Sequence, residues 1–200
     1  MRTTSLFVAT LAATAAFVPP QRALAHHHDI EVPSMPASLE VPPGNEVYLL
    51  VHAIGTQNYV CLPTAGGYAW SFWGPQAILF DDDDDQKLSH YLSPDGGGTA
   101  RPTWTHSKDS STVWGAAQAS ATSVTDPDFV EAGSIPWLLL AIVDSEDGPG
   151  GGHKLSDTTF IQRLDTAGGV APAGGCAVLA DVGKRVFVPY TTDYYFWRSE

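Results

Sequence analysis

The sequence is poor in basic residues and, beyond its first 25 positions, in long apolar runs. Ten Lys and Arg stand against 22 Asp and Glu, which gives a formal net charge of −12. This balance argues against nucleic acid or anionic lipid as a partner, because both carry negative charge. No later stretch approaches the ~20 consecutive apolar residues that a helix needs to cross a bilayer. We therefore expect no membrane span.

Cysteine is also scarce, and the two that are present, Cys61 and Cys176, show no C-x-x-C or histidine-spaced metal pattern. In an oxidising compartment an even pair of this kind favours a disulfide. The alternative is a pair of buried free thiols. The chain also lacks an N-x-[ST] site, so we expect no N-glycosylation.

The N-terminus has the features of a secretory leader. Arg2 precedes an apolar run from Leu6 to Val18, and Ala23-Leu24-Ala25 has the small-x-small form that signal peptidase cuts. These features predict a signal peptide over residues 1–25 and a secreted, extracellular protein. Residues 26–45 are rich in proline and predict an irregular arm, and residues 46–198 predict one folded domain.

Residues 46–198 read as a succession of short strands. EVYLLVHA and GTQNYVC predict two paired strands, and Pro75 predicts a break between YAWSFW and QAILF. Helical periodicity is weak, and its best candidate is the alanine-containing segment Gly115–Ser123. We expect an all-β fold of roughly nine to eleven short strands, arranged as a sandwich or a barrel.

The longest apolar run after the leader lies within Ser134–Cys176. Ile135–Val143 is apolar almost throughout, which predicts a strand buried on both faces with Pro136 tolerated only near its start. A glycine-rich turn and a second strand, TTFIQRL, follow. The acidic run Asp81–Asp85 predicts a solvated turn. A Ca²⁺ site is the alternative, although the run lacks the alternate spacing and the glycine of known calcium loops.

Several blocks together resemble the secreted domain of unknown function 3455, a family of exported bacterial and fungal proteins without an assigned activity. The blocks are GTQNYVC, GYAWSFWGPQAILFD, HYLSPDGGGTARPTW, SIPWLLLAI, TTFIQRLDTAGGVAP with GGC, and VPYTTDYYFW. The resemblance implies GPTW and Asp-Gly-Ser where this chain has Arg101 before Pro102 and Ser110 after Asp109. It also implies a shorter, less charged turn in place of Asp81–Asp85.

Some fungal members of this family are labelled malate dehydrogenase, and the sequence argues against that activity. A dinucleotide site needs G-x-G-x-x-G between a strand and a helix. The segment Gly148–His153 lacks the last glycine and precedes no helical pattern. No G-x-S-x-G motif for a nucleophilic serine is present either.

The histidines at the predicted mature N-terminus suggest a copper hypothesis. Cleavage after Ala25 would expose His26-His27-His28, and a terminal histidine offers both its amine and a ring nitrogen to Cu(II). His26, His28 and an internal imidazole, for which His90 ranks first ahead of His52 and His106, would then serve a copper-dependent oxidative enzyme. Loose metal capture is the simpler alternative.

Aromatic residues suggest a different role, the binding of a carbohydrate, lipid or cell-wall ligand. The candidate ligand surface comprises Tyr68, Trp70, His90, Tyr91 and Trp104. Aromatic rings give a large rigid contact area at low entropic cost. The alternative is that these rings form the core. We expect a binding or cell-surface interaction module without a catalytic set, and the copper enzyme is the competing class.

Overall fold

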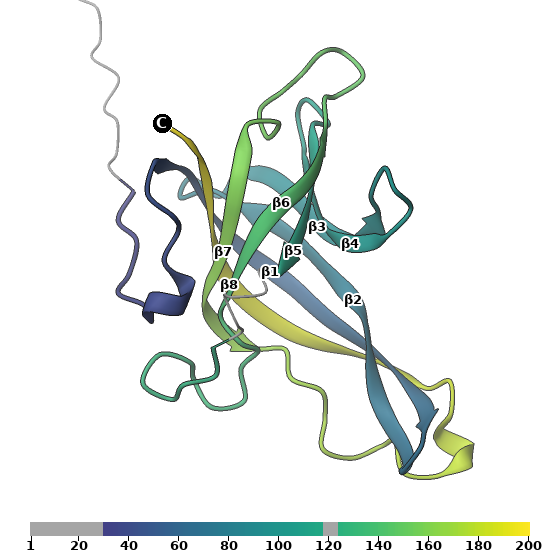
Figure 1. The fold of residues 1–200 in the computed structure, drawn as a ribbon. Coiled ribbons are helices and arrows are strands. Elements are labelled where there is room, and N and C mark those ends of the chain that lie inside the picture. The colour runs from purple at the N-terminus through teal and green to yellow at the C-terminus, as the bar shows by residue number, and fades with distance from the viewer. Residues whose placement is uncertain (1–29, 118–123) are drawn as a thin grey trace, which may run out of the picture.

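The computed structural model describes residues 30–117 and 124–200. Eight antiparallel strands form a closed barrel, in which each strand pairs with its neighbours along the chain and β8 closes against β1 (Figure 1). The strands are β1 (Asn45–Thr64), β2 (Gly67–Phe80), β3 (Gln86–Pro94), β4 (Ala100–His106), β5 (Thr112–Ala117), β6 (Leu138–Glu146), β7 (Thr158–Gly168) and β8 (Arg185–Ser199). The prediction of an all-β fold is confirmed, and the barrel is the form it takes.

The described strands are fewer than the nine to eleven predicted, because two predicted breaks do not occur. EVYLLVHA and GTQNYVC do not pair with each other; both belong to the 20-residue strand β1, which pairs with β2 on one side and β8 on the other. Gly55, between them, makes no turn. A Cβ at Gly55 would lie 2.2 Å from the carbonyl oxygen of Gln76, so the glycine permits a close approach of β1 and β2.

The predicted break at Pro75 is also absent, since Pro75 lies within β2 opposite Gln57 of β1. The strand tolerates Pro75 because of where this residue, which has no backbone N–H, lies in the sheet. Strand β2 pairs with β3 only over Ala77–Phe80, so Pro75 lies beyond the end of that ladder and forfeits no bond to β3. A β-bulge between Asn58 and Tyr59 further bends this part of the sheet.

The helical prediction for Gly115–Ser123 is wrong where the structure describes it. Gly115 to Ala117 form the end of β5 and pair with β6. A Cβ at Gly115 would lie 3.1 Å from the ring of Trp104, so packing against this tryptophan overrides the local preference of the alanines. The remaining residues, 118–123, lie outside the described part of the chain.

Two apolar cores explain the continuous apolar run of β6. Leu140 packs inside the barrel, whereas its neighbour Leu139 packs on the outside, and both are at most 4% exposed. Burial on both faces is therefore confirmed for Leu139 and Leu140, whereas Val143, at the end of the predicted run, is 48% exposed. The strand begins at Leu138, after Pro136. The outer core is closed by Leu39 of the short 3-10 helix η1 (Ala37–Leu39) and by Trp137.

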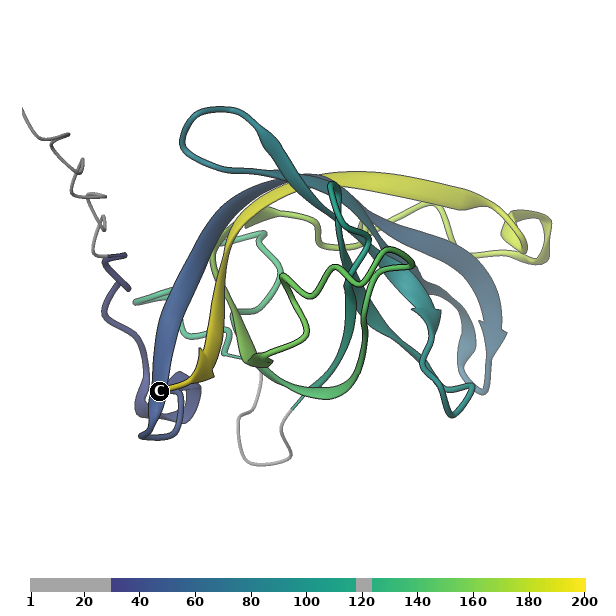
Figure 2. The ribbon, with the colours of Figure 1, turned by 90° about the horizontal axis from the view of Figure 1, so that it is seen from above.

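Residues 30–44 form a strap on the outer face of the barrel. They run beside β7 and the end of β8 in both ribbon views (Figures 1 and 2). Gln162 of β7 is fully buried beneath the strap, and its Nε2 donates to the carbonyl oxygen of Leu39 at 2.7 Å. The Gln162 Oε1 accepts a bond of 2.9 Å from Nε1 of Trp197. One side chain thus links the strap, β7 and β8.

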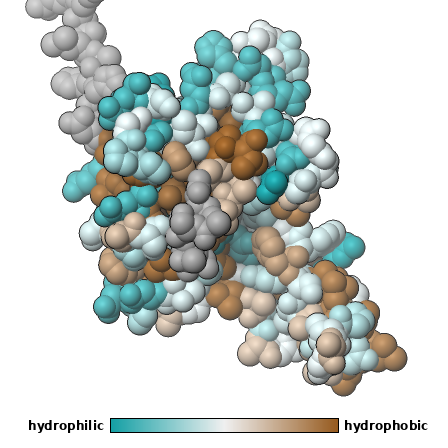
Figure 3. Space-filling model, viewed as in Figure 1, coloured by the Kyte–Doolittle hydropathy of each residue, from teal (hydrophilic) through white to brown (hydrophobic). Residues whose placement is uncertain are grey.

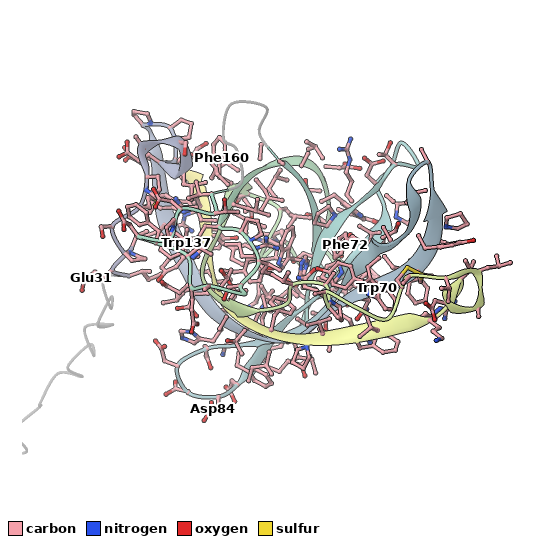
Figure 4. The ribbon with its side chains drawn as sticks, turned by 90° about the horizontal axis from the view of Figure 1, so that it is seen from below. Glu31, Trp70, Phe72, Asp84, Trp137 and Phe160 are labelled. Carbon is pink, nitrogen blue, oxygen red and sulfur yellow. A yellow bond between two sulfur atoms is a disulfide. The ribbon has the colours of Figure 1, made fainter. Side chains whose placement is uncertain are left out.

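The first half of β2, the end of β1 and the start of β8 project from the barrel as a long arm (Figure 1). The predicted disulfide between Cys61 and Cys176 is confirmed, with a Cα–Cα distance of 5.5 Å. It ties β1 to the loop before the 3-10 helix η2 (Leu179–Asp181). Trp70 lies beside this bond (Figure 4), and its Nε1 donates to the carbonyl oxygen of Gly174 at 2.9 Å. The described residues include no helix of the length and apolarity needed to cross a membrane.

Candidate functional site

The barrel interior contains a pocket of about 260 Å³. Its lining comes from all strands except β5, and from the loop before β6. The lining residues are Gln57, Tyr59, Phe72, Pro75, His90, Pro102, Trp104, Ile135, Pro136, Leu138, Leu140, Arg163 and Tyr194. Phe72 is 54% exposed, so the pocket reaches the surface beside it. Figure 4 shows Phe72 on the β2 side, with Trp137 and Phe160 across the barrel.

The alternation of strand side chains decides which residues reach this pocket. In β1, Val51 and Ala53 face the inner core, and the same face continues to Gln57. In β7 and β8, Arg163 and Tyr194 are directly opposite partners, so their side chains share the inward face. The inward faces are apolar around the core and carry polar groups where the pocket lies.

His90 is a buried, neutral imidazole on the pocket wall. Its Nδ1 lies 2.8 Å from the carbonyl oxygen of Thr103, so Nδ1 carries the proton and Nε2 is left as an acceptor. Burial lowers the pKa of His90 to about 3, and it outweighs the opposing effect of the bond to Thr103. The ring is therefore uncharged near neutral pH.

Three lining side chains carry buried polar atoms without a hydrogen-bond partner among the described residues. These atoms are Nε2 of Gln57, Nε1 of Trp104 and the hydroxyl of Tyr194. Each side chain is at most 2% exposed. Burial also raises the pKa of Tyr194, so its hydroxyl keeps its proton. All three atoms can donate, and an unpaired buried donor costs about 1–3 kcal/mol unless something accepts from it.

Arg163 supplies the positive charge of the pocket. Its Nε and Nη2 donate to the carbonyl oxygen of Pro136 at 3.2 and 2.7 Å. Within the described chain it forms no ion pair, and the pocket lining contains no Asp or Glu. Since a guanidinium has five N–H groups, three remain available. The sequence did not single out Arg163, Gln57 or Tyr194.

A second hollow of about 880 Å³ lies on the outer face of the barrel, over β8, β1, β2 and β3. It has exposed apolar walls, which include Ile54 and Phe187 at 62% and 54% exposure. Pro75 and His90 line both this outer hollow and the inner pocket, so they separate the two. Figure 3 shows further apolar side chains on the projecting arm, where Leu179 is 73% exposed.

The five residues of the predicted ligand surface lie in three different parts of the structure. His90 and Trp104 line the inner pocket. Tyr91, the neighbour of His90, is 37% exposed, and its hydroxyl lies 2.8 Å from Oγ1 of Thr105. Tyr68 and Trp70 belong to the projecting arm, where Tyr68 pairs with Pro63 of β1. A ligand contact by each of these residues stays a prediction. His90 and Trp104 share the inner pocket, and His90 and Tyr91 share the outer hollow.

The copper hypothesis stays a prediction. His26 and His28 lie outside the described residues. In the chain that the structure does describe, no group of three or more His, Cys, Asp or Glu side chains is placed to hold a metal ion. The Asp81–Asp85 run forms the turn between β2 and β3, closed by a 3.0 Å bond from the Asp84 N–H to the Asp81 carbonyl oxygen.

Comparison with known proteins supports the family resemblance. Residues 42–198 match the family described as a protein of unknown function (DUF3455). No curated protein and no solved structure gives a significant match to the chain. The matched region contains the whole barrel apart from the last residue of β8. The chain therefore belongs to the DUF3455 family.

Proposed function

We propose that this protein is a binding protein that holds a small organic ligand inside its barrel. The observation that carries the proposal is the set of unpartnered buried polar atoms on the pocket wall. Buried polar groups in native proteins are nearly always hydrogen-bonded, so several orphaned donors around one cavity require an explanation. A ligand with acceptor atoms provides one.

The pocket resembles small-molecule sites in its chemistry. Such sites have mostly apolar walls with a few placed polar groups. Here Ile135, Leu138 and Leu140 supply apolar wall, and Trp104 adds an aromatic face. The volume of about 260 Å³ corresponds to roughly nine water-sized groups, which suits a small compact ligand.

The residues of the pocket favour binding over catalysis. The lining contains no Ser, Cys, Asp or Glu that could act as a nucleophile or a general base. The one imidazole, His90, uses Nδ1 in a bond to the main chain, and burial keeps its pKa far below neutral. These features support a rigid receptor for a ligand rather than a site that moves protons.

The test is a thermal-shift screen of the secreted protein against small organic molecules, with native mass spectrometry of the protein as purified. We expect a bound small molecule, or a ligand that raises the melting temperature. Leu140→Trp should fill the pocket and abolish the shift, while the matched variant Ile54→Trp, on the exposed outer face, should keep it. A wild-type protein that binds nothing in a broad screen contradicts the proposal.

The competing copper-dependent oxidative enzyme is tested separately. N-terminal sequencing of the secreted chain shows whether it begins at His26, and copper titration of that species measures the affinity. A chain that begins elsewhere, or that takes up copper only weakly, rules out the copper site. Copper binding should be insensitive to Leu140→Trp if the metal and the interior ligand occupy different places.

A further inference from the structure

We infer that the ligand of the inner pocket is a small organic carboxylate, whose charged group pairs with Arg163 and whose apolar body lies against Trp104 and the aliphatic wall. This inference rests on the proposed function, because it identifies the chemical class of the ligand for the same pocket. Three features of the pocket support a carboxylate: its charge, the donors on its wall, and its size.

The pocket has an uncompensated positive charge. Arg163 lines the pocket, it forms no ion pair within the described residues, and the lining holds no acidic side chain. The other titratable wall residues are His90, Tyr59 and Tyr194, and all three are neutral near pH 7. A partly buried cation without a counter-ion is costly, so an anion in the pocket is favoured.

Apart from Nε2 of His90, which is an acceptor, the free polar atoms identified on the pocket wall are donors. Gln57 Nε2 and Trp104 Nε1 are donors, the Tyr194 hydroxyl can donate, and three N–H groups of Arg163 are unused. Arg163 and Tyr194 are directly opposite partners on β7 and β8, so their polar ends belong to one part of the wall. A carboxylate has two oxygens with about four acceptor sites and matches a guanidinium in geometry.

The size and walls of the pocket limit the rest of the ligand. The volume of about 260 Å³ admits a single ring or a short chain attached to the carboxylate. One guanidinium balances one negative charge, which favours a monocarboxylate over a doubly charged phosphate in walls that are otherwise apolar. Trp104 and Tyr59 offer ring faces, and Leu138 offers an aliphatic surface.

The test compares probes that differ in charge but not in shape. Calorimetric titration with phenylacetate and phenylacetamide, and with hexanoate and hexanamide, measures the preference for a carboxylate. We expect wild-type protein to bind each carboxylate at least tenfold more tightly than its amide. Arg163→Gln should reduce this preference to within about threefold, because it weakens the carboxylates far more than the amides. Arg163→Lys should keep part of the preference, since it keeps the charge.

Arg163→Gln removes bonds to Pro136, so its folding is checked by circular dichroism and by its melting temperature. Arg163→Lys serves as the second variant if the glutamine variant is unstable. Equal affinity for carboxylate and amide, or an unchanged preference in Arg163→Gln, overturns the inference. If a screen finds only neutral ligands, and Leu140→Trp abolishes their binding, the carboxylate inference is overturned but the proposed function stands. A protein that binds no small molecule overturns both.

Discussion

His90 and Trp104 lie directly opposite each other on β3 and β4, and their rings stack with centroids 4.2 Å apart and planes 11° apart. Tyr194 completes the cluster with its ring edge-on to both. His90 donates from Nδ1 to the main chain, so the stack is built on a neutral imidazole. Protonation of His90 would place a charge in the barrel interior, and this links the candidate site to the stability of the fold.

The first prediction is that His90 makes the protein lose stability in mild acid. Its pKa is about 3 in the folded protein and about 6.5 in the unfolded chain. Between these values the unfolded chain binds a proton that the folded protein does not, so stability falls as the pH falls. One group of this kind lowers the free energy of unfolding by about 1.4 kcal/mol for each pH unit below 6.5, within the range between the two pKa values. Urea unfolding at pH 7, 6 and 5 measures the slope, which His90→Phe should flatten.

His52 provides the matched control, because its effect has the opposite sign. Partial burial lowers the pKa of His52, but the bonds to Asp82 and Asp193, of 3.0 and 2.6 Å, raise it overall. The stabilisation that His52 gives to the folded protein is complete at low pH and is lost as the pH rises through that raised pKa. His52→Gln should therefore steepen the loss in acid. An unchanged slope in His90→Phe contradicts the first prediction.

The pocket could be predicted from the sequence only in part. The sequence singled out His90 and Trp104, since aromatic rings and a histidine within strand patterns suggest binding. Arg163 and Gln57 were missed because a polar residue in an alternating strand normally faces solvent. Only closure of β8 onto β1 turns that face of the sheet into an interior. The signal that was available is the single Arg in TTFIQRL, on the same face as the apolar Ile161.

The second prediction is that Ser110→Gly stabilises the protein. Ser110 has φ +60°, a left-handed conformation that costs most residues about 1–2 kcal/mol and costs glycine little. The family pattern implies glycine at this position. Glycine also has a larger conformational entropy in the unfolded chain, and this offsets part of the gain. We expect the free energy of unfolding, measured in urea, to rise by about 0.5–1 kcal/mol.

Ser145 is the control for this substitution, because it is also exposed but lies in β6, without a positive φ. Ser145→Gly should destabilise the protein by roughly 0.5–1 kcal/mol, as glycine does in a regular strand. A loss of stability in both variants would show that the conformation of Ser110 carries no strain that glycine relieves.

The fold was predictable to the level of class but not of strand number. Residue types typical of strands, glycines at turns and the apolar run of β6 indicate an all-β domain. These signals are local, so they can be recognised in the sequence alone. The same local signals predicted a division between EVYLLVHA and GTQNYVC, where Gly55 lies, and a break at Pro75. Their actual roles depend on partners far along the chain: Gly55 lets β2 approach, and Pro75 lies past the end of the β2–β3 ladder. Such roles are set by pairing and not by propensity.

The third prediction concerns the disulfide between Cys61 and Cys176. It joins residues 115 positions apart, and a loop of this length corresponds to about 4–5 kcal/mol in the chain-entropy account. Cys61→Ala with Cys176→Ala should lower the free energy of unfolding by up to this amount. The mass of the native protein after alkylation, with and without reduction, checks the bond itself. Alkylation of both thiols without reduction would contradict the pairing.

The fourth prediction is that Gln162 anchors the strap of residues 30–44. Gln162→Leu leaves the buried carbonyl oxygen of Leu39 and the partly buried Nε1 of Trp197 without their partner. Each unsatisfied group costs about 1–3 kcal/mol, so we expect the free energy of unfolding to fall by about 2–6 kcal/mol in urea unfolding, with faster proteolysis within the strap. Gln86→Leu, at an exposed position of β3, should change neither. If Gln162→Leu leaves the protease resistance of the strap intact, the apolar contacts of Leu39 alone hold it, and the polar anchor is dispensable.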